Sequence, residues 1–440
     1  MDFSSVERVN QVNKNGRVAI VYGLRTPFVK SGTLFRNLSS LDLGKIVTGE
    51  LLNRTEIDPE ELDKVIFGTV LPSIKTSNLA REISLGSGVP VTTPAFTVTS
   101  ACASATQAFT DGVSSILSGD SDVVLVGGVE SISDFPVLFS KGFRNMLFDS
   151  SKGKTILEKA KPFLKMGVSD IAPDMPAIAE RSTGLTMGES AEKMARQNQI
   201  SRRDQDEFAL RSHTLASKAQ KEEIFRREMI KTFIPPNFEE PVFTDNAVKS
   251  DLTIETLKEL KPAFDKEYGT VTSGNSAPLS DGACALLLMS EERAKALGFK
   301  PLGYVRSYAY SALDPGDQLL MGPAYSTPAA LDKAGLTLKD MDILEIHEAF
   351  SAQVLSNIRA FASKKFAEEK LSRTKALGDI DMDKVNVTGG SIAIGHPFGA
   401  TGGRIILTLL YALQRRQANF GLATVCAAGG LGATVVLERE

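Results

Sequence analysis

The sequence predicts an α/β fold with two similar layered halves and a helical insertion between them. Short apolar runs typical of buried strands alternate with amphipathic helical runs, and the links between them are short. The last third of the chain repeats the alternation of the first third, and in both a cysteine stands at a junction. The stretch between them is richer in charge and in helix-forming residues.

The first third is predicted to alternate strands with helices. Short runs of apolar and β-branched residues indicate strands at 17–22, 65–70, 96–99 and 121–126. A helix is expected at 43–54. A second helix follows Cys102 and ends at Gly119 and Asp120. Its apolar residues recur at helical spacing, at Phe109, Val113, Ile116 and Leu117.

The last third begins with a glycine-rich run that becomes a helix over 399–415. A strand at 422–425 then reaches Cys426, and a closing strand follows at 433–438. Between the two thirds, 135–261 is predicted to be an inserted, mainly helical region. Its clearest helical stretch is 189–221, and Pro235-Pro236 interrupts the pattern.

Composition indicates an ordinary globular protein. The 440 residues suffice for two or three domains or one large duplicated one, and 42% are hydrophobic and 23% charged. The net charge of -3 gives no reason to expect a nucleic acid partner. Three scattered cysteines do not form a disulfide framework and suit a reducing compartment. With no signal peptide evident and no apolar run of about 18 residues, we expect a cytoplasmic, bacterial-type protein.

The three cysteines and three histidines are the scarcest reactive residues, and most of them lie among small residues. Cys102 follows a predicted strand and precedes a helix, and a helix N-terminus stabilises a thiolate. We therefore interpret Cys102 as a nucleophile with a lowered pKa, the alternative being a buried structural cysteine. Cys284 has no such junction and is expected in the core.

His396 lies in a run with glycines at 389, 390, 395, 399, 402 and 403. The run lacks the Lys-Ser/Thr pair of a phosphate-binding loop, and the glycines at 429–432 precede a strand and not a helix, so neither is a nucleotide motif. The spacing of the histidines and cysteines does not support a metal site, and we expect none. A histidine that moves protons for a thiol is the sharper hypothesis.

Several sequence blocks, taken together and in order, resemble the thiolase family over almost the whole chain. These blocks are 98–105, 187–192, 200–206, 212–213, 261–264, 269–275, 281–282, 347–350, 389–402 and 426–432. The resemblance implies a five-layered α-β-α-β-α arrangement of two halves, with an inserted loop domain that binds coenzyme A. The implied domains are 1–134, continuing at about 262–295, then the loop domain 135–261, and 296–440.

The resemblance also implies roles for the reactive residues. Cys102 would take the acyl group, His396 would activate it, and Cys426 would carry the proton to or from the leaving acyl-CoA. One oxyanion site would use His396 and a water held at His347, and the other the backbone N–H groups of Cys102 and Ala428. The implied contacts to coenzyme A or substrate are Met187, Lys249, Thr256, Ser273, Gly274, Ala277, Leu279, Ala349 and Phe350.

Some positions depart from the common family pattern. Many thiolases carry Asn where this chain has His347, and Ala277 and Lys249 stand where relatives often have Ser and Arg. The His-Glu-Ala-Phe version looks like the thiolase subunit of the fatty-acid oxidation multienzyme (trifunctional) complex. That implies an acetyl-CoA C-acyltransferase of β-oxidation with coenzyme A as co-substrate and no further cofactor. It also implies a homodimer that joins a hydratase/dehydrogenase α subunit.

The insertion at 135–181 fits the same subgroup. Phe139, Phe143, Met146 and Leu147 are predicted to share a helical face, and 137–167 holds seven basic residues against Asp149 and Glu158. These basic residues are Lys141, Arg144, Lys152, Lys154, Lys159, Lys161 and Lys165. One interpretation is a solvated helix that covers the core. The other is an interfacial helix that touches anionic lipid or the partner subunit, which would make the protein peripheral at the membrane.

The leading hypothesis is a degradative 3-ketoacyl-CoA thiolase. An acetoacetyl-CoA-forming biosynthetic thiolase and a decarboxylating ketoacyl synthase are the alternatives among enzymes, and His347 keeps the second alternative open. A lipid-carrying or scaffolding relative without activity is the alternative from another class. The joint presence of Cys102, His396 and Cys426 argues against it.

Overall fold

A computed structural model describes residues 16–71, 73–174 and 179–439. The prediction that no signal peptide is present rests on residues 1–15, which lie outside the described residues. The described residues form two compact units. The small unit is Phe135–Ala179, and the large unit holds the residues up to Asp134 together with those from Glu180 on. The predicted insertion 135–261 spans the small unit and part of the large one.

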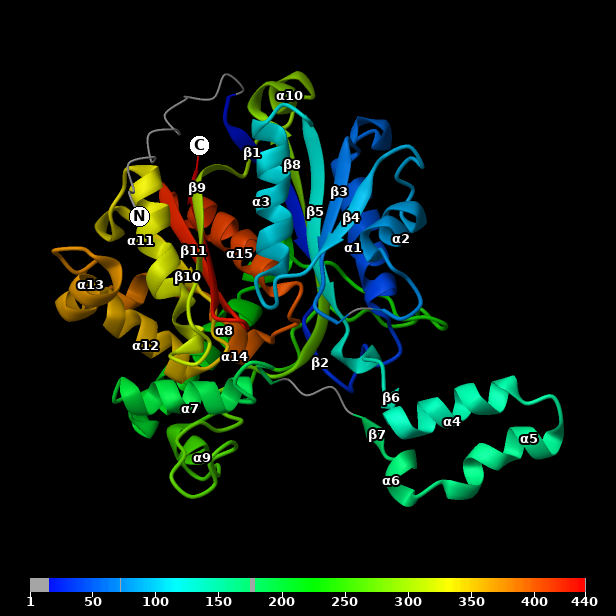
Figure 1. Cartoon of the computed structure of the whole chain (residues 1–440). Helices are drawn as coiled ribbons and strands as arrows, with labels where there is room; N and C mark the ends of the chain where they lie inside the picture. The colour runs from blue at the N-terminus through cyan, green and yellow to red at the C-terminus, as the bar shows by residue number, and fades with distance from the viewer. Residues whose placement is uncertain (1–15, 72, 175–178, 440) are drawn as a thin grey trace, which may run out of the picture. The chain divides into compact units, whose positions relative to one another are not determined.

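A ten-stranded sheet organises the large unit (Figure 1). Its strands follow the order β10-β11-β12-β9-β1-β8-β5-β3-β4, with β2 beside β8. Their bounds are β1 Val18–Arg25, β2 Val29–Lys30, β3 Lys64–Gly68, β4 Ala95–Val98, β5 Val123–Glu130, β8 Ser280–Ser290, β9 Gly303–Ala312, β10 Ile343–Ile346, β11 Phe420–Ala427 and β12 Leu431–Glu438. The strands predicted from the sequence are all present.

The strand order contains an internal repeat. In the first half, β1 and β8 pair antiparallel, β8 and β5 antiparallel, and β5, β3 and β4 parallel. The second half follows the same scheme with β9, β12, β11 and β10, and a parallel bridge from Leu344 to Val385 replaces the last strand. The halves meet where β1 and β9 pair through Ala19–Tyr304 and Ile20–Gly303. The predicted duplication is confirmed.

The helices lie in layers on either side of these strands. Helices α3 (Ser104–Leu117) and α15 (Thr401–Arg416) share one apolar core with strands of both halves. A second core packs α1 (Ser40–Thr55) and α2 (Leu79–Gly86) on the first half. A third packs α11 (Gly322–Ala334) and α12 (Ser351–Ala362) on the second half. Together they make the predicted α-β-α-β-α order.

The stretch 189–221 is helical, as predicted, and it is divided between two helices. Helix α7 covers Met187–Gln197 and α8 covers Arg202–Lys221. Gln199 adopts a left-handed φ of 54°, and Ser201 caps α8 through a capping box with Asp204. The other α-helices in the described part of the large unit are α9 Ile254–Lys258, α10 Glu291–Ala296, α13 Lys364–Leu371 and α14 Ser391–Ile394.

The small unit is a strand pair with short helices. Its elements are β6 Leu138–Phe139, α4 Lys141–Lys152, α5 Ile156–Ala160, α6 Val168–Ile171 and β7 Pro173–Asp174. The single helical face predicted here is wrong for Phe139, which lies in β6, whereas Phe143, Met146 and Leu147 share one face of α4 at i, i+3 and i+4. The Phe139 and Phe143 rings do touch, at 4.9 Å. Within the described residues, no helix combines the length and apolarity needed to cross a bilayer.

Candidate active site

Cys102 sits in a tight turn between β4 and α3. Ala101, just before it, has a left-handed φ of 46°, a backbone conformation that residues other than glycine rarely adopt. The Ser104 hydroxyl holds this turn, because it donates to the Ala101 carbonyl (2.6 Å) and accepts from the Ser100 N–H (2.8 Å). The turn leaves Cys102 only partly buried, ahead of the first turn of α3.

His396 reaches Cys102 from the loop between α14 and α15. Its Nε2 lies 3.3 Å from the Cys102 Sγ, across 294 residues of sequence. Gly395, with a φ of 115°, lets the chain turn into this position. The His396 N–H donates to the Pro278 carbonyl at 3.2 Å, which ties the loop to the segment before β8. The structure thus brings together the two residues predicted to form the nucleophile and its base.

Both groups are neutral at physiological pH. Burial, with a smaller contribution from Arg404, lowers the pKa of His396 to about 3. Burial also raises the pKa of Cys102 to about 12, although the Ala428 and Cys102 backbone N–H groups oppose the rise. The predicted lowering of the Cys102 pKa by the helix N-terminus is therefore wrong, because desolvation of the thiolate outweighs the local dipole. His396 must take the proton as attack occurs.

This ionisation state predicts how Cys102 reacts with iodoacetamide. When the pH lies far below the pKa of a thiol, the thiolate fraction grows about tenfold with each pH unit. The alkylation rate should therefore rise about tenfold per pH unit between about pH 7 and pH 10. Mass spectrometry of the Cys102 peptide, with Cys102→Ala as the blank, measures this rate. A plateau below about pH 8 would show instead a pre-formed thiolate.

Cys426, the last residue but one of β11, lies beside the same site. It is fully buried, and burial raises its pKa well above the ordinary value, with a further rise from nearby Cys102. After it the chain turns back through Gly429 and Gly430, with φ of 84° and 71°, so that the Ala428 N–H reaches the Cys102 thiol. A protonated Cys426 can serve as a proton donor there.

His347 completes the cluster from the end of β10. Its ring centroid lies 4.3 Å from that of His396, and its Nδ1 lies 3.1 Å from the Ser391 hydroxyl. Burial lowers its pKa well below the usual range, and His396 and Arg404 add to that effect. One ligand atom each of Cys102, His347 and His396 lies within 4.8 Å of the others, and these are ligand types that zinc accepts.

Two supporting residues, Thr401 and Glu130, were not predicted from the sequence. The Thr401 hydroxyl lies 2.7 Å from the His396 Nδ1 and donates to the Pro397 carbonyl. The Glu130 carboxylate, at the end of β5, accepts N–H bonds from Val70, Leu71 and Gly399, each at 3.0 Å. Burial raises its pKa to about 7. A carboxylate that ends an otherwise apolar strand was the available signal.

Several residues predicted to contact coenzyme A or substrate lie beside the loop that carries His396. The Ala277 N–H donates to the Ala349 carbonyl at 2.9 Å, and Ser276 forms an isolated antiparallel β-bridge with Phe350. Leu279 forms a parallel β-bridge with His396, and 41% of Leu279 is exposed. The segment 276–280 therefore connects His396 with the loop that carries His347, and Leu279 offers an apolar wall near the site.

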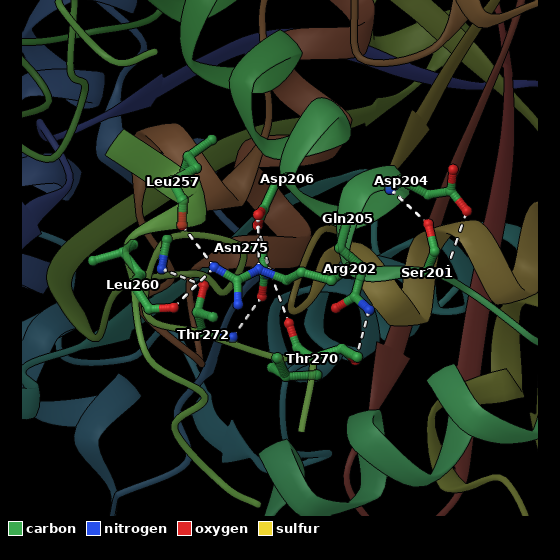
Figure 2. Close-up of polar contacts among 12 residues, drawn as sticks. Ser201, Arg202, Asp204, Gln205, Asp206, Leu257, Leu260, Thr270, Thr272 and Asn275 are labelled. Atoms are coloured by element: carbon green, nitrogen blue, oxygen red, sulfur yellow. Dashed lines mark hydrogen bonds and ion pairs between the residues drawn. The ribbon is translucent and has the colours of Figure 1, made fainter. Parts of the chain in front are cut away.

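A buried polar network anchors the start of this segment (Figure 2). The Asn275 side chain donates to Asp206, which accepts at 2.7 Å from Arg202. Arg202 also donates to the Leu257 and Leu260 carbonyls, so it ties α8 to α9. Gly274 is buried against the same two leucine side chains, and Ser273 is exposed.

A basic hollow of about 330 Å³ lies along α8. Three lysines, Lys218, Lys221 and the predicted Lys249, line it against one acidic residue, Glu222. The other lining residues are Thr214, Ser217, Ser250 and Leu252. Lys218 and Lys221, which lie at helical spacing on α8, were not predicted from the sequence. The two other predicted contacts lie on further helices: Met187 opens α7, and Thr256 is exposed on α9.

The chain matches two family models over nearly its whole length. Residues 18–292 match the model described as thiolase, N-terminal domain, and residues 299–439 match thiolase, C-terminal domain. Among curated proteins, a 3-ketoacyl-CoA thiolase of Shewanella baltica is 48% identical over 427 residues, 97% of this chain and 98% of that protein. A 3-ketoacyl-CoA thiolase of Photobacterium profundum is 49% identical over 424 residues, 96% of this chain and 97% of that protein.

Solved structures with the same fold include two enzymes of related names. The human mitochondrial 3-ketoacyl-CoA thiolase superposes with a TM-score of 0.82 at 32% identity, covering 96% of this chain and 99% of that one. The Bacillus anthracis acetyl-CoA acetyltransferase gives a TM-score of 0.82 at 33% identity, covering 97% and 100%.

Proposed function

The chain belongs to the thiolase family, and from this premise we propose that it is a degradative 3-ketoacyl-CoA thiolase. It would cleave a 3-ketoacyl-CoA with coenzyme A into acetyl-CoA and an acyl-CoA shortened by two carbons. The observation that carries the proposal is the 3.3 Å contact between the Cys102 thiol and the His396 imidazole, with the Cys426 thiol beside them. The names of the relatives support the same activity.

The first half-reaction forms an acyl-enzyme. The Cys102 proton passes to the His396 Nε2 while the sulfur attacks the 3-keto carbon. Hydrogen-bond donors stabilise the resulting oxyanion, and the bond between C2 and C3 then breaks. The electron pair moves to C2 of the leaving acetyl-CoA enolate, which takes the Cys426 proton.

The second half-reaction returns the enzyme to its starting state. The Cys426 thiolate takes the proton of the coenzyme A thiol, whose sulfur attacks the acyl group on Cys102. The Cys102 thiolate leaves and recovers its proton from His396. The cycle balances with coenzyme A as co-substrate and calls for no other cofactor.

A cleavage assay tests the proposed function. Purified protein is mixed with coenzyme A and 3-ketoacyl-CoA substrates from four carbons upward, and acetyl-CoA formation and loss of the 3-keto chromophore are measured. We expect cleavage of substrates longer than acetoacetyl-CoA. Activity confined to acetoacetyl-CoA would favour the biosynthetic alternative, and no cleavage at any length would overturn the proposal.

The basic hollow on α8 suits the phosphates of coenzyme A. Reversing Lys218 and Lys221 to Glu should raise the KM for coenzyme A by roughly tenfold or more, because each reversal replaces attraction by repulsion near a phosphate. The kcat should change little, because neither residue lies among the catalytic groups. Reversing Lys364 and Lys365 on α13 is the matched control. An unchanged KM in the Lys218/Lys221 variant would exclude the hollow as the phosphate site.

The small unit is proposed to be a membrane-docking segment of a peripheral enzyme. Ile156, Leu157 and Leu164 are 86%, 84% and 83% exposed, which is unusual for large aliphatic residues. They lie on or next to α5, and Lys152, Lys154, Lys159 and Lys161 lie in the same stretch. Apolar side chains beside basic ones suit the surface of an anionic bilayer, where each lysine contributes about 1 kcal/mol.

Charge reversal tests this assignment. We expect the wild type to sediment with vesicles containing anionic lipid at low salt, and the change of these four lysines to Glu to abolish sedimentation while cleavage of soluble substrate continues. The control reverses Lys364, Lys365, Lys370 and Lys375. If the wild type ignores vesicles but the variant loses a co-purifying hydratase/dehydrogenase subunit, the segment serves the proposed hetero-oligomer instead. Light scattering of the purified chain tests the proposed homodimer.

A further inference from the structure

The two neighbouring histidines, His347 and His396, are held in the same way but with opposite consequences. Each ring is buried, and each Nδ1 lies against one hydroxyl, Thr401 at 2.7 Å for His396 and Ser391 at 3.1 Å for His347. A neutral imidazole carries a single N–H, so the direction of the hydrogen bond at Nδ1 decides what Nε2 can do.

At His396 the hydroxyl acts as an acceptor. The Thr401 hydroxyl donates its own hydrogen to the Pro397 carbonyl at 2.9 Å. Its oxygen must therefore accept from the Nδ1–H of His396. The Nε2 is left without a hydrogen and accepts from the Cys102 thiol, as a general base requires.

At His347 the hydroxyl acts as a donor. The Ser391 oxygen accepts from the Arg404 guanidinium at 2.9 Å, and a guanidinium has no acceptor to return the bond. Among the described residues, the only other hydrogen-bond partner of that hydroxyl is the His347 Nδ1. If Nδ1 carried the ring proton, the buried Ser391 hydrogen would have no acceptor. The ring proton of His347 therefore sits on Nε2, which has no partner within the described protein.

Burial and an ion pair fix the position of the Arg404 guanidinium. It is 1% exposed, and its Nη1 lies 3.6 Å from the Glu345 carboxylate, two residues before His347. Arg404 and Thr401 lie three residues apart in the first turn of α15. The first turn of α15 therefore supplies Thr401, which contacts His396 directly, and Arg404, which acts on His347 through Ser391.

We propose that Ser391 and Arg404 are positioning residues that fix His347 as the Nε2–H tautomer, opposite to that of His396. The resting site then holds one imidazole that accepts the Cys102 proton and one that donates to an oxygen, either the substrate carbonyl or a bound water. Once His396 has taken the proton, both rings present an Nε2–H. This proposal deepens the proposed function and rests on it for its catalytic consequence.

Imidazole ¹⁵N NMR of the resting protein tests the tautomers directly, and the chain has only three histidines. We expect Nε2–H at His347 and Nδ1–H at His396. His213 is the internal reference for an Nε2–H ring, because its Nδ1 accepts from the Lys249 N–H at 3.1 Å. Detection of the proton on Nδ1 of His347 in the wild type would overturn the proposal.

Ser391→Ala supplies the second test. We expect it to shift the His347 ring signals, leave those of His396 in place, and lower kcat by roughly 10- to 100-fold, less than loss of an oxyanion donor itself. Ser391→Thr keeps the hydroxyl and should restore both readouts. The matched control is Ser356→Ala, which removes an equally buried hydroxyl that bonds within α12.

The two proposals fail in different ways. The NMR result refers to the resting protein and does not depend on turnover, whereas a wild type that cleaves no 3-ketoacyl-CoA would sink the proposed function alone. Unchanged ring signals and unchanged kcat in Ser391→Ala would show that Ser391 is not a positioning residue. Arg404→Lys, which keeps a buried donor, should lie between the wild type and Ser391→Ala in kcat.

Discussion

Replacing Cys102 by alanine is expected to abolish thiolase turnover and to leave no acyl-enzyme. The variant loses the atom that forms the covalent bond, and loss of a nucleophile lowers kcat by roughly 10⁴- to 10⁶-fold. Cys102→Ser should be nearly as inactive, because an alcohol is less acidic than a thiol and a poorer leaving group. Intact-protein mass spectrometry after mixing with acyl-CoA measures the acyl-enzyme directly.

The control for this experiment is Cys284→Ala. Cys284 is fully buried in β8 and its thiol donates to the Ala400 carbonyl at 3.2 Å, so it is a core residue, as expected from the sequence. Its variant should still acquire one acyl group, on the Cys102 peptide. Acylation that persists in Cys102→Ala, or that maps to Cys284 or Cys426, would contradict the assignment.

The change Cys426→Ala is expected to separate the two halves of the reaction. Acid–base catalysis at the C2 carbon disappears with the thiol, so steady-state cleavage should fall by roughly 10²- to 10⁴-fold. Transfer of an acyl group from acyl-CoA to Cys102 also loses the proton that Cys426 exchanges with coenzyme A, but a thiolate leaves without a proton far more readily than a C2 carbanion. Acyl transfer should therefore slow much less than cleavage and persist in a single-turnover experiment. Rapid quenching followed by mass spectrometry follows the acyl-enzyme.

A second measurement makes the result specific to proton transfer. The wild type should exchange hydrogen at C2 of acetyl-CoA with deuterium from heavy water once Cys102 is acylated, and Cys426→Ala should not. Cys426→Ser keeps the volume but raises the pKa of the donor further, so it should resemble Cys426→Ala. Steady-state cleavage at the wild-type rate in Cys426→Ala would return Cys426 to a role in core packing.

The ionisation of the site reverses an expectation drawn from local sequence. The position of Cys102 before α3 suggested a stabilised thiolate, yet burial raises its pKa to about 12 and lowers that of His396 to about 3. Because the thiol and the imidazole are both neutral at rest, formation of the nucleophile depends more on the direct contact between them than on the pKa of either group alone. The proton must move within one 3.3 Å contact as the substrate arrives.

Most of the secondary structure followed from the sequence alone. The periodicity of Phe109, Val113 and Ile116 marked α3, and the apolar run before Cys426 marked β11, because periodicity is a property of neighbouring residues. The duplication of the two halves and the reactive residues at their strand–helix junctions were also predicted from the sequence. The break between α7 and α8 was not, although the Ser201–Asp204 capping box is a local signal.

The tertiary structure decided what those reactive residues can do. It brought Cys102 within reach of His396 across 294 positions, placed Lys218 and Lys221 beside Lys249, and set Arg404 behind Ser391. No local pattern contains these facts, since desolvation and hydrogen-bond direction depend on every segment that packs around a group. The sequence by itself determined which residues are chemically able to react, and packing decided their protonation, because the free energy of a buried charge depends on its whole surroundings.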